Sequence, residues 1–156
     1  MKSFYILSGC GLIMNYELKR ANQNDISMLI HYKLKNIFEY SEKLSEEEIN
    51  RIIDYVKRHV PMQLRDYKTI YNNDNIIGCL LVENKDDGVL LDEIYLEENY
   101  RNKGIGSDII KKVILNNSIV YLWVYKLNIK AVSLYIKLGF KIIEETETRY
   151  YMKYSN

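Results

Sequence analysis

The sequence predicts one domain of the α/β (α+β) class, and two observations support this prediction. Apolar residues recur at helical spacing in four segments, and seven other short runs are rich in β-branched and aromatic residues. The chain has 156 residues, of which 47% are hydrophobic and one is proline. That composition suits a single core of ordinary size, and no internal repeat or linker interrupts the pattern.

The N-terminal half begins with a predicted strand at residues 16–20, which two predicted helices follow. Asp25 can cap the first helix, because a carboxylate there accepts a bond from a free backbone N–H. Ser45 and Glu48 have the spacing of a capping box for the second helix. We expect Pro61 to end that helix, because a proline disfavours helical geometry in the residue before it.

The remaining elements alternate between strand and helix. A hairpin turn is predicted at Asn72–Asn75, whose residues tolerate positive φ, and Gly139 is predicted to cap the last helix. The further strands are residues 67–71, 76–82, 89–96, 119–125, 140–145 and 149–154, and the further helices are residues 105–115 and 130–138. The predicted order is therefore β-α-α-β-β-β-α-β-α-β-β.

Composition excludes several classes of partner. The formal net charge is +1, so there is no broad electrostatic attraction to nucleic acid or to an anionic membrane. No apolar run approaches the length of about 20 residues that spans a bilayer. Cys10 and Cys79 have no metal-ligand residues close in sequence. We therefore expect a cytoplasmic protein with no metal, no nucleic-acid partner and no membrane partner.

The segment Arg101–Gly106 joins a predicted strand to a predicted helix. The first N–H groups of a helix have no partner inside it, and the helix dipole adds positive potential, so this is a place for phosphate. Gly104 and Gly106 allow close approach of the backbone. The segment lacks the Gly-Lys-Ser/Thr ending of a Walker loop and the G-x-G-x-x-G of a dinucleotide site.

A second motif, Asn128–Phe140, follows the next predicted strand. Together the two motifs resemble those of the GNAT superfamily of acyl-CoA N-acyltransferases. The Q/R-x-x-G-x-G/A motif of that family is matched by Arg101–Gly106, and its N-x-x-A-x-x-L-Y-x-x-x-G-F motif is matched at every fixed position by Asn128–Phe140. The resemblance covers residues 14–154. It implies the GNAT fold, a mixed central sheet of about seven strands with a splay between strands 4 and 5, flanked by four helices.

The N-terminus contains Leu7-Ser8-Gly9-Cys10, which looks like a lipoprotein cleavage box. The apolar stretch before it is shorter than the roughly 7–15 residues of an export signal. The segment that starts at Met14 is similar to the beginning of many GNAT chains. We interpret residues 1–13 as an N-terminal extension, with Met1 or Met14 as the natural start. Residues 14–156 are interpreted as a single GNAT N-acetyltransferase domain.

The resemblance implies acetyl-CoA as the co-substrate and assigns residues to it. The pyrophosphate would lie on the turn before the third helix and the pantetheine arm along the end of the fourth strand, with Asn128 holding that arm. A backbone N–H near Leu96 would face the thioester carbonyl. The predicted cofactor-binding residues are Ile94, Tyr95, Leu96, Arg101, Asn102, Lys103, Gly104, Ile105, Gly106, Ser107, Asn128 and Tyr135.

The same resemblance implies that Tyr135 is the general acid. A phenol, with an ordinary pKa of about 10, stays protonated at neutral pH and suits the role. The alternative is that Tyr135 is one core aromatic among 15 tyrosines.

Asp92 and Glu93 are adjacent acids in an otherwise apolar strand, so alternation predicts that only one faces a given cleft. Polyamine acetyltransferases of this family carry a similar pair, which implies Asp92 as the base, with Glu93 beside it. Many other members have a glutamate where this chain has Leu90. The alternative is a pair that marks a solvated strand edge.

Other residues have weaker assignments. In the family, the region of the first helix that holds His31, Tyr32, Glu39 and Tyr40 walls the acceptor pocket. Trp123 is expected to pack in the core.

The sequence thus predicts an N-acetyltransferase that moves an acetyl group from acetyl-CoA to a primary amine of a small molecule by direct attack. Alternatives are acetylation of a protein lysine or N-terminal amine, and an acyl-CoA sensor without turnover. A toxin directed at nucleic acid would require a basic face, which the net charge does not favour. Exposed tyrosines near the C-terminal strands could serve a homodimer.

Overall fold

A computed structural model describes residues 5–8 and 11–156 of the chain. Seven strands form one sheet in the order β3-β4-β5-β6-β7-β9-β8. β6 and β7 pair in parallel and the other neighbours pair antiparallel, so the sheet is mixed as predicted. The strands are β3 (Glu17–Arg20), β4 (Tyr67–Asn72), β5 (Asn75–Lys85), β6 (Gly88–Leu96), β7 (Ile119–Tyr125), β8 (Lys141–Glu145) and β9 (Arg149–Ser155).

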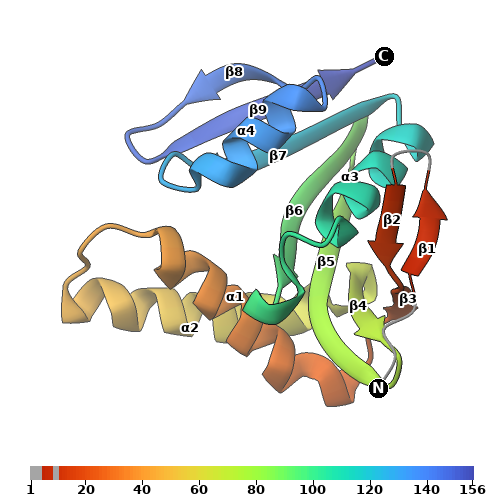
Figure 1. Cartoon of the computed structure of the whole chain (residues 1–156). Coiled ribbons are helices and arrows are strands. Elements are labelled where there is room, and N and C mark those ends of the chain that lie inside the picture. The colour runs from red at the N-terminus through yellow and green to blue at the C-terminus, as the bar shows by residue number, and fades with distance from the viewer. Residues whose placement is uncertain (1–4, 9–10) are drawn as a thin grey trace.

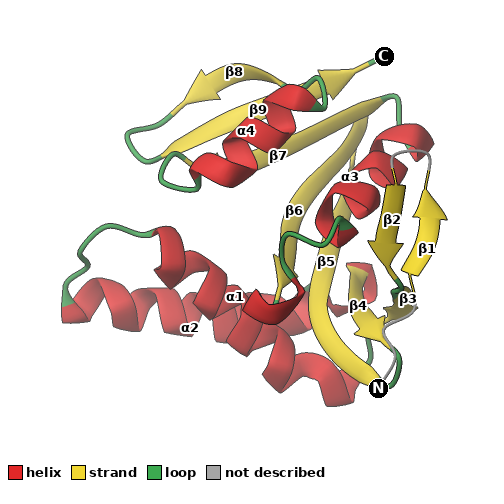
Figure 2. Ribbon diagram, viewed as in Figure 1, coloured by secondary structure: helices red, strands yellow, loops and turns green. Residues whose placement is uncertain are grey.

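Four α-helices flank this sheet, as the predicted order requires (Figure 2). They are α1 (Ile26–Tyr40), α2 (Glu46–Met62), α3 (Ile105–Asn116) and α4 (Ile129–Lys137). In the described part of the chain, no helix combines the length and the apolar character needed to cross a membrane.

A separate two-stranded sheet precedes the main one. It consists of β1 (Tyr5–Ser8) and β2 (Gly11–Met14), which pair antiparallel. Cys10 and part of the sequence that resembles a lipoprotein box lie outside the described residues. The interpretation of residues 1–13 as an extension stays a prediction.

Two hydrophobic clusters hold the helices to the two faces of the sheet. One cluster contains Ile105 and Ile109 of α3 together with Leu122 of β7. The other contains Leu29 of α1 and Val56 of α2, packed with residues of β4, β5 and β6. Burial of this much apolar surface is the main favourable term in folding, and each helix therefore presents its apolar stripe to the sheet.

The parallel strands β6 and β7 separate along their length. Their pairing begins at Val89 with Val120 and ends at Leu91 with Leu122, although β6 continues to Leu96. Figure 1 shows the two strands meeting at one end and diverging toward the other, with α4 on one side of the opening. β6 and β7 are the fourth and fifth strands of the predicted order, so the predicted splay between these strands is confirmed.

A bulge interrupts β6 at Asp92. In the pairing with β5, Leu91 lies opposite Val82 and Glu93 lies opposite Leu81, so Asp92 is the extra residue. A bulge resets the alternation of side chains. Leu91 accordingly packs in the cluster of α3 and α4, whereas Tyr95 packs in the cluster of α1 and α2.

Two helix ends differ from the predictions. The Asp25 side chain does not cap α1. It accepts a bond from the backbone N–H of Asn22 at 2.8 Å, as part of a capping box on the short 3-10 turn before α1. Pro61 does not end α2, which continues to Met62. The backbone N–H of Gln63 donates to the carbonyls of His59 and Val60, so the last turn closes around the proline.

Candidate active site

A groove of about 910 Å³ runs between the end of α1, the end of β6, the start of α3 and α4. It brings together residues that are far apart in the sequence. The predicted cofactor-binding residues that line it are Ile94, Tyr95, Leu96, Arg101, Asn102, Gly106, Asn128 and Tyr135. The predicted residues Lys103, Gly104, Ile105 and Ser107 do not line it.

The turn at the start of α3 contains two left-handed residues, Asn102 with a φ of 58° and Gly104. Gly104 is the N-cap of α3 with a φ of 83°, where a side chain would be strained. The first helical bond is donated by the N–H of Asp108 to the Gly104 carbonyl at 3.0 Å. The N–H groups before it have no helical partner. Ile105 is buried in the core, so only its backbone is available to a ligand.

Arg101 lines the groove but is already bonded. Its guanidinium donates two bonds to the Glu39 carboxylate, at 2.6 and 3.1 Å, and its Nε donates to the Leu96 carbonyl at 2.7 Å. The guanidinium holds the pKa of Glu39 below its usual range. This fork joins the end of α1 to the turn before α3, so Arg101 shapes the groove wall as well as adding positive charge.

A smaller cavity of about 360 Å³ lies at the splay between β6 and β7. It is lined by residues of α1 and β6 on one side and by Trp123, Tyr125 and Arg149 on the other. This cavity and the groove share six lining residues: Asn36, Tyr40, Ile94, Asn128, Ala131 and Tyr135. The two spaces therefore adjoin where Tyr135 lies.

The Tyr135 ring packs against another aromatic ring, and the residue also lines the groove. Its ring makes an edge contact with Phe140, with the two ring centroids 5.5 Å apart. Burial raises the pKa of its phenol above the ordinary value. Among the described residues, the Tyr135 hydroxyl has no hydrogen-bond partner, so it is available to a ligand. Asn128 caps α4 by accepting a bond from the N–H of Ala131 at 3.2 Å.

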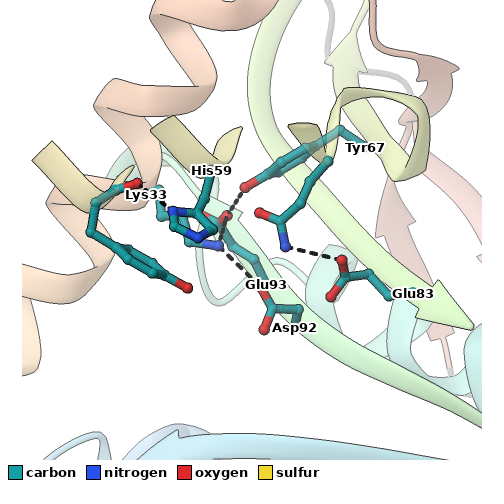
Figure 3. Close-up of polar contacts among 8 residues, drawn as sticks. Lys33, His59, Tyr67, Glu83, Asp92 and Glu93 are labelled. Atoms are coloured by element: carbon teal, nitrogen blue, oxygen red, sulfur yellow. Dashed lines mark hydrogen bonds and ion pairs between the residues drawn. The ribbon is translucent and has the colours of Figure 1, made fainter. Parts of the chain in front are cut away.

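Both acids of the pair line the smaller cavity, and this corrects the prediction that they face opposite ways. The Lys33 ammonium of α1 lies 3.0 Å from Asp92 Oδ2 and 3.8 Å from Glu93 Oε2 (Figure 3). The bulge at Asp92 is the physical reason, because it breaks the alternation that the prediction assumed. The pair is also no solvated edge, since 2% of the Glu93 side chain is exposed.

One oxygen of Glu93 is bonded to a tyrosine, and the buried Cys79 thiol also lies beside this carboxylate. Its Oε2 accepts a bond from the Tyr67 hydroxyl at 2.6 Å, as Figure 3 shows, whereas its buried Oε1 has no partner among the described residues. Burial raises the pKa of Glu93, and the nearby Lys33 cation and the Tyr67 hydroxyl oppose that rise. Burial also raises the pKa of Tyr67. A carboxylate with a raised pKa and a free oxygen is equipped to take up a proton.

Other predicted residues lie at varying distances from the site. Glu39 and Tyr40 line the groove, and Tyr40 also lines the smaller cavity. Tyr32 is buried and donates to Glu97 at 2.7 Å, and His31 is exposed. Trp123 was predicted to pack in the core, and this prediction is wrong. Its half-buried ring stacks on Tyr151 and lines the cavity.

The sequence reasoning missed two residues that contact the acid pair, Tyr67 and Lys33. A signal for Lys33 existed, because this residue follows Leu29 by four residues and precedes Ile37 by four. It therefore lies within the apolar stripe of α1, where a cation needs a buried partner.

A third cavity, of about 760 Å³, adjoins the small one. It lies between the α1–α2 connection and the β8–β9 turn, and it shares Ile37, Tyr55, Tyr125 and Arg149 with the small cavity. The small cavity therefore adjoins both the groove and the third cavity.

The chain was compared with known proteins by sequence and by structure. A family model described as the acetyltransferase (GNAT) domain matches residues 65–142. No curated protein matches the chain by sequence. The PaiA N-acetyltransferase of Thermoplasma acidophilum, solved with coenzyme A, is similar in structure with a TM-score of 0.71 at 19% identity, over 92% of this chain and 100% of that one.

Two further solved structures share the fold. The apo form of YjaB from Escherichia coli has a TM-score of 0.71 at 18% identity, over 90% of this chain and 98% of its own. Naa50 of Arabidopsis thaliana, solved with the bisubstrate analogue CoA-Ac-MVNAL, has a TM-score of 0.60 at 20% identity, over 90% of this chain and 99% of its own.

Proposed function

This chain belongs to the GNAT acetyltransferase family and is an acyltransferase, and from that premise we propose that it moves an acetyl group from acetyl-CoA to a primary amine of a small molecule. The observation that carries the proposal is the meeting of two cavities at Tyr135. One cavity has the features of a cofactor groove and the other has those of an amine site.

The groove fits a long ligand that carries phosphate. The free N–H groups at the start of α3, preceded by Gly104, suit the pyrophosphate. Asn102 and Gly106 line the groove beside that turn, and Gly106 leaves space there for a ligand. We assign the pantetheine arm to the strand end Ile94–Leu96 and to Asn128. Lys103 and Ser107 are assigned a peripheral role, since neither lines the groove.

The acid pair would prepare the acceptor for attack. An acceptor amine arrives as an ammonium ion, and Glu93 or Asp92 takes one of its protons. The amine nitrogen then forms a bond to the thioester carbon, and the carbon–sulfur bond breaks. Tyr135 gives its proton to the departing sulfur, and the second amine proton, lost as the amide forms, restores the phenol. A backbone N–H near Leu96 is assigned to the oxyanion.

A longer acceptor is the second candidate. The third cavity, of about 760 Å³, would admit a peptide or a protein lysine as well as a small amine. Naa50 was solved with an analogue that contains a peptide sequence, and this similarity extends to the fold only. A sensor that binds acyl-CoA without turnover would use the groove alone, and the acid pair would then have no role.

Release of free thiol from acetyl-CoA tests the proposal directly. The purified chain would be assayed with a panel of polyamines, monoamines, aminoglycosides, amino acids and peptides, and the acetylated product would be identified by mass. We expect turnover with at least one small primary amine. Turnover with peptides alone would favour the second candidate. CoA binding without turnover across the panel would indicate a sensor.

A further inference from the structure

α1 places a cation inside the cavity that we assign to the acceptor. Lys33 has 13% of its side chain exposed, and its ammonium lies 3.0 Å from Asp92 and 3.8 Å from Glu93. The two carboxylates raise the pKa of Lys33 against the opposing effect of burial, so the side chain is a cation at neutral pH. A buried cation with two carboxylates occupies the place where an acceptor ammonium would be expected to bind.

The charges that line this cavity are nearly balanced. Three carboxylates line it, those of Glu83, Asp92 and Glu93, together with the cations of Lys33 and Arg149. When all five groups are ionised, one negative charge remains. Glu83 is already bonded, because it accepts from the Gln63 amide at 3.0 Å. Tyrosines are the other ionisable groups on the lining.

One buried oxygen of the acid pair can also accept a further hydrogen bond. Glu93 Oε2 receives the Tyr67 hydroxyl, and Lys33 bonds Asp92 Oδ2. Glu93 Oε1 is the buried side-chain oxygen left without a partner in the described part of the chain. A buried polar atom without a partner is costly, and an ammonium ion in the cavity would supply the missing bond.

We propose that Lys33 is a specificity residue that permanently fills one of two ammonium places at the acid pair, so that the acceptor contributes a single ammonium group near the reacting carbon. The inference rests on the proposed function and names its substrate class. A monoamine places one cation in the remaining place. A short diamine or polyamine brings a second cation, for which the cavity offers no uncompensated carboxylate, so the acid pair alone does not indicate a polyamine substrate.

A purely structural role for Lys33 makes a different prediction. If Lys33 only offset the cost of burying two carboxylates, its removal would lower stability and would reduce activity toward every amine by the same factor. A specificity role predicts a change in the ratio between acceptors. Lys33→Ala vacates the cation place and leaves Asp92 and Glu93 intact, so a second ammonium can enter.

The test compares butylamine with 1,4-diaminobutane, which differ by one ammonium group. The diamine has two equivalent amino groups, so its kcat/KM is halved to give a value per amine. In the wild type, this value should not exceed kcat/KM for the monoamine. In K33A the ratio of diamine to monoamine should rise by about tenfold or more, equivalent to about 1.4 kcal/mol. In K33R, which keeps the charge, the ratio should stay near that of the wild type. Lys57→Ala, at an exposed position of α2, is the matched control.

Binding measurements make the outcome independent of turnover. Calorimetry of both amines, in the presence of CoA, gives the same ratio from affinities. If no variant acetylates any amine, the proposed function fails, and the binding ratio still decides the role of Lys33. A K33A ratio within threefold of the wild-type value would overturn the inference. If K33A does not fold, a wild type that favours the diamine by more than tenfold would overturn it.

Discussion

Tyr135 combines a buried ring with a hydroxyl that has no partner among the described residues. The ring belongs to the core cluster of α3 and α4, so packing holds its position without help from the oxygen. Burial raises the pKa of the phenol, which keeps it protonated. These properties suit a group that gives up a proton only when a thiolate departs beside it.

Tyr135→Phe should therefore separate chemistry from stability. General acid catalysis is worth about 10²–10⁴-fold, so kcat should fall by that factor, or about 3–5 kcal/mol of barrier. Affinity for acetyl-CoA and the melting temperature should change little, because the ring remains. Steady-state kinetics and a melting curve test this, with Tyr71→Phe, on β4, as the control. A change in kcat below threefold, with chemistry rate-limiting, would contradict the role.

Glu93 should make stability depend on pH in an unusual direction. Its pKa in the folded protein lies above the ordinary value of 4.5, chiefly because of burial. As pH rises above that value, the unfolded chain loses this proton first, so the free energy of unfolding falls until the folded pKa is passed. Glu93→Gln removes the effect, and the melting temperature of the variant minus that of the wild type should rise with pH.

Melting curves between about pH 4 and pH 8 measure that difference. Glu98→Gln, at an exposed position, provides a control whose difference should stay flat. A difference that fell with pH would mean that the ion pair of Glu93 with Lys33 outweighs the cost of burial.

At the scale of elements, the turn before α3 includes a left-handed glycine, and so does the end of α4. Gly104 has a φ of 83°, and Gly139 after α4 has a φ of 100°. A left-handed conformation costs other residues about 1–2 kcal/mol. Alanine at either position should therefore lower stability by a similar amount.

Of the two variants, only Gly104→Ala should also weaken CoA binding, by about tenfold or more, or about 1.4 kcal/mol, because we assign the phosphate to that turn and not to the end of α4. Calorimetry on both variants, each shown to be folded, makes the comparison. Equal CoA affinity in the Gly104 and Gly139 variants would contradict the assignment of the phosphate turn.

The sequence was sufficient for features that depend on local order. The cap at Gly139, the hairpin turn at Asn73 and the order of elements follow from turn chemistry and periodicity. Contacts between residues that are distant in the chain could not be predicted from the sequence. Lys33 meets Asp92 across 59 positions, and Arg101 meets Glu39 across 62. The bulge at Asp92 was also hidden, because it is a property of how β6 pairs with β5 rather than of either strand alone.

At the scale of the whole molecule, the sheet consists of two parts joined by few pairs. β3 to β6 form one part and β7 to β9 the other, and Val89, Leu90 and Leu91 of β6 make the pairs that connect them. The groove is lined from both parts, by Ile94–Leu96 of one and by α4 of the other. A ligand in the groove would contact both parts and should stabilise the fold.

CoA should accordingly raise the melting temperature. At about 100 times its dissociation constant a ligand adds about 2.7 kcal/mol, which for a domain of this size is roughly 5–10 °C. Thermal shift assays with CoA, and with pantetheine as a control without phosphate, measure this effect. Pantetheine should give a smaller shift, and a CoA shift below about 1 °C at that saturation would count against the groove.

Because Asp92 is the extra residue of the bulge, β6 can lose one residue at this position without a change in its pairing with β5. If Asp92 were deleted, Leu91 would be followed directly by Glu93, and regular alternation would keep each side chain on its present face. A deletion at another position beyond the bulge, up to Leu96, would turn the side chains on one side of the gap to the opposite face. When related chains are aligned, a one-residue gap is therefore compatible with this fold at Asp92. Such a relative would keep the strand and lose a carboxylate of the cavity that we assign to the acceptor.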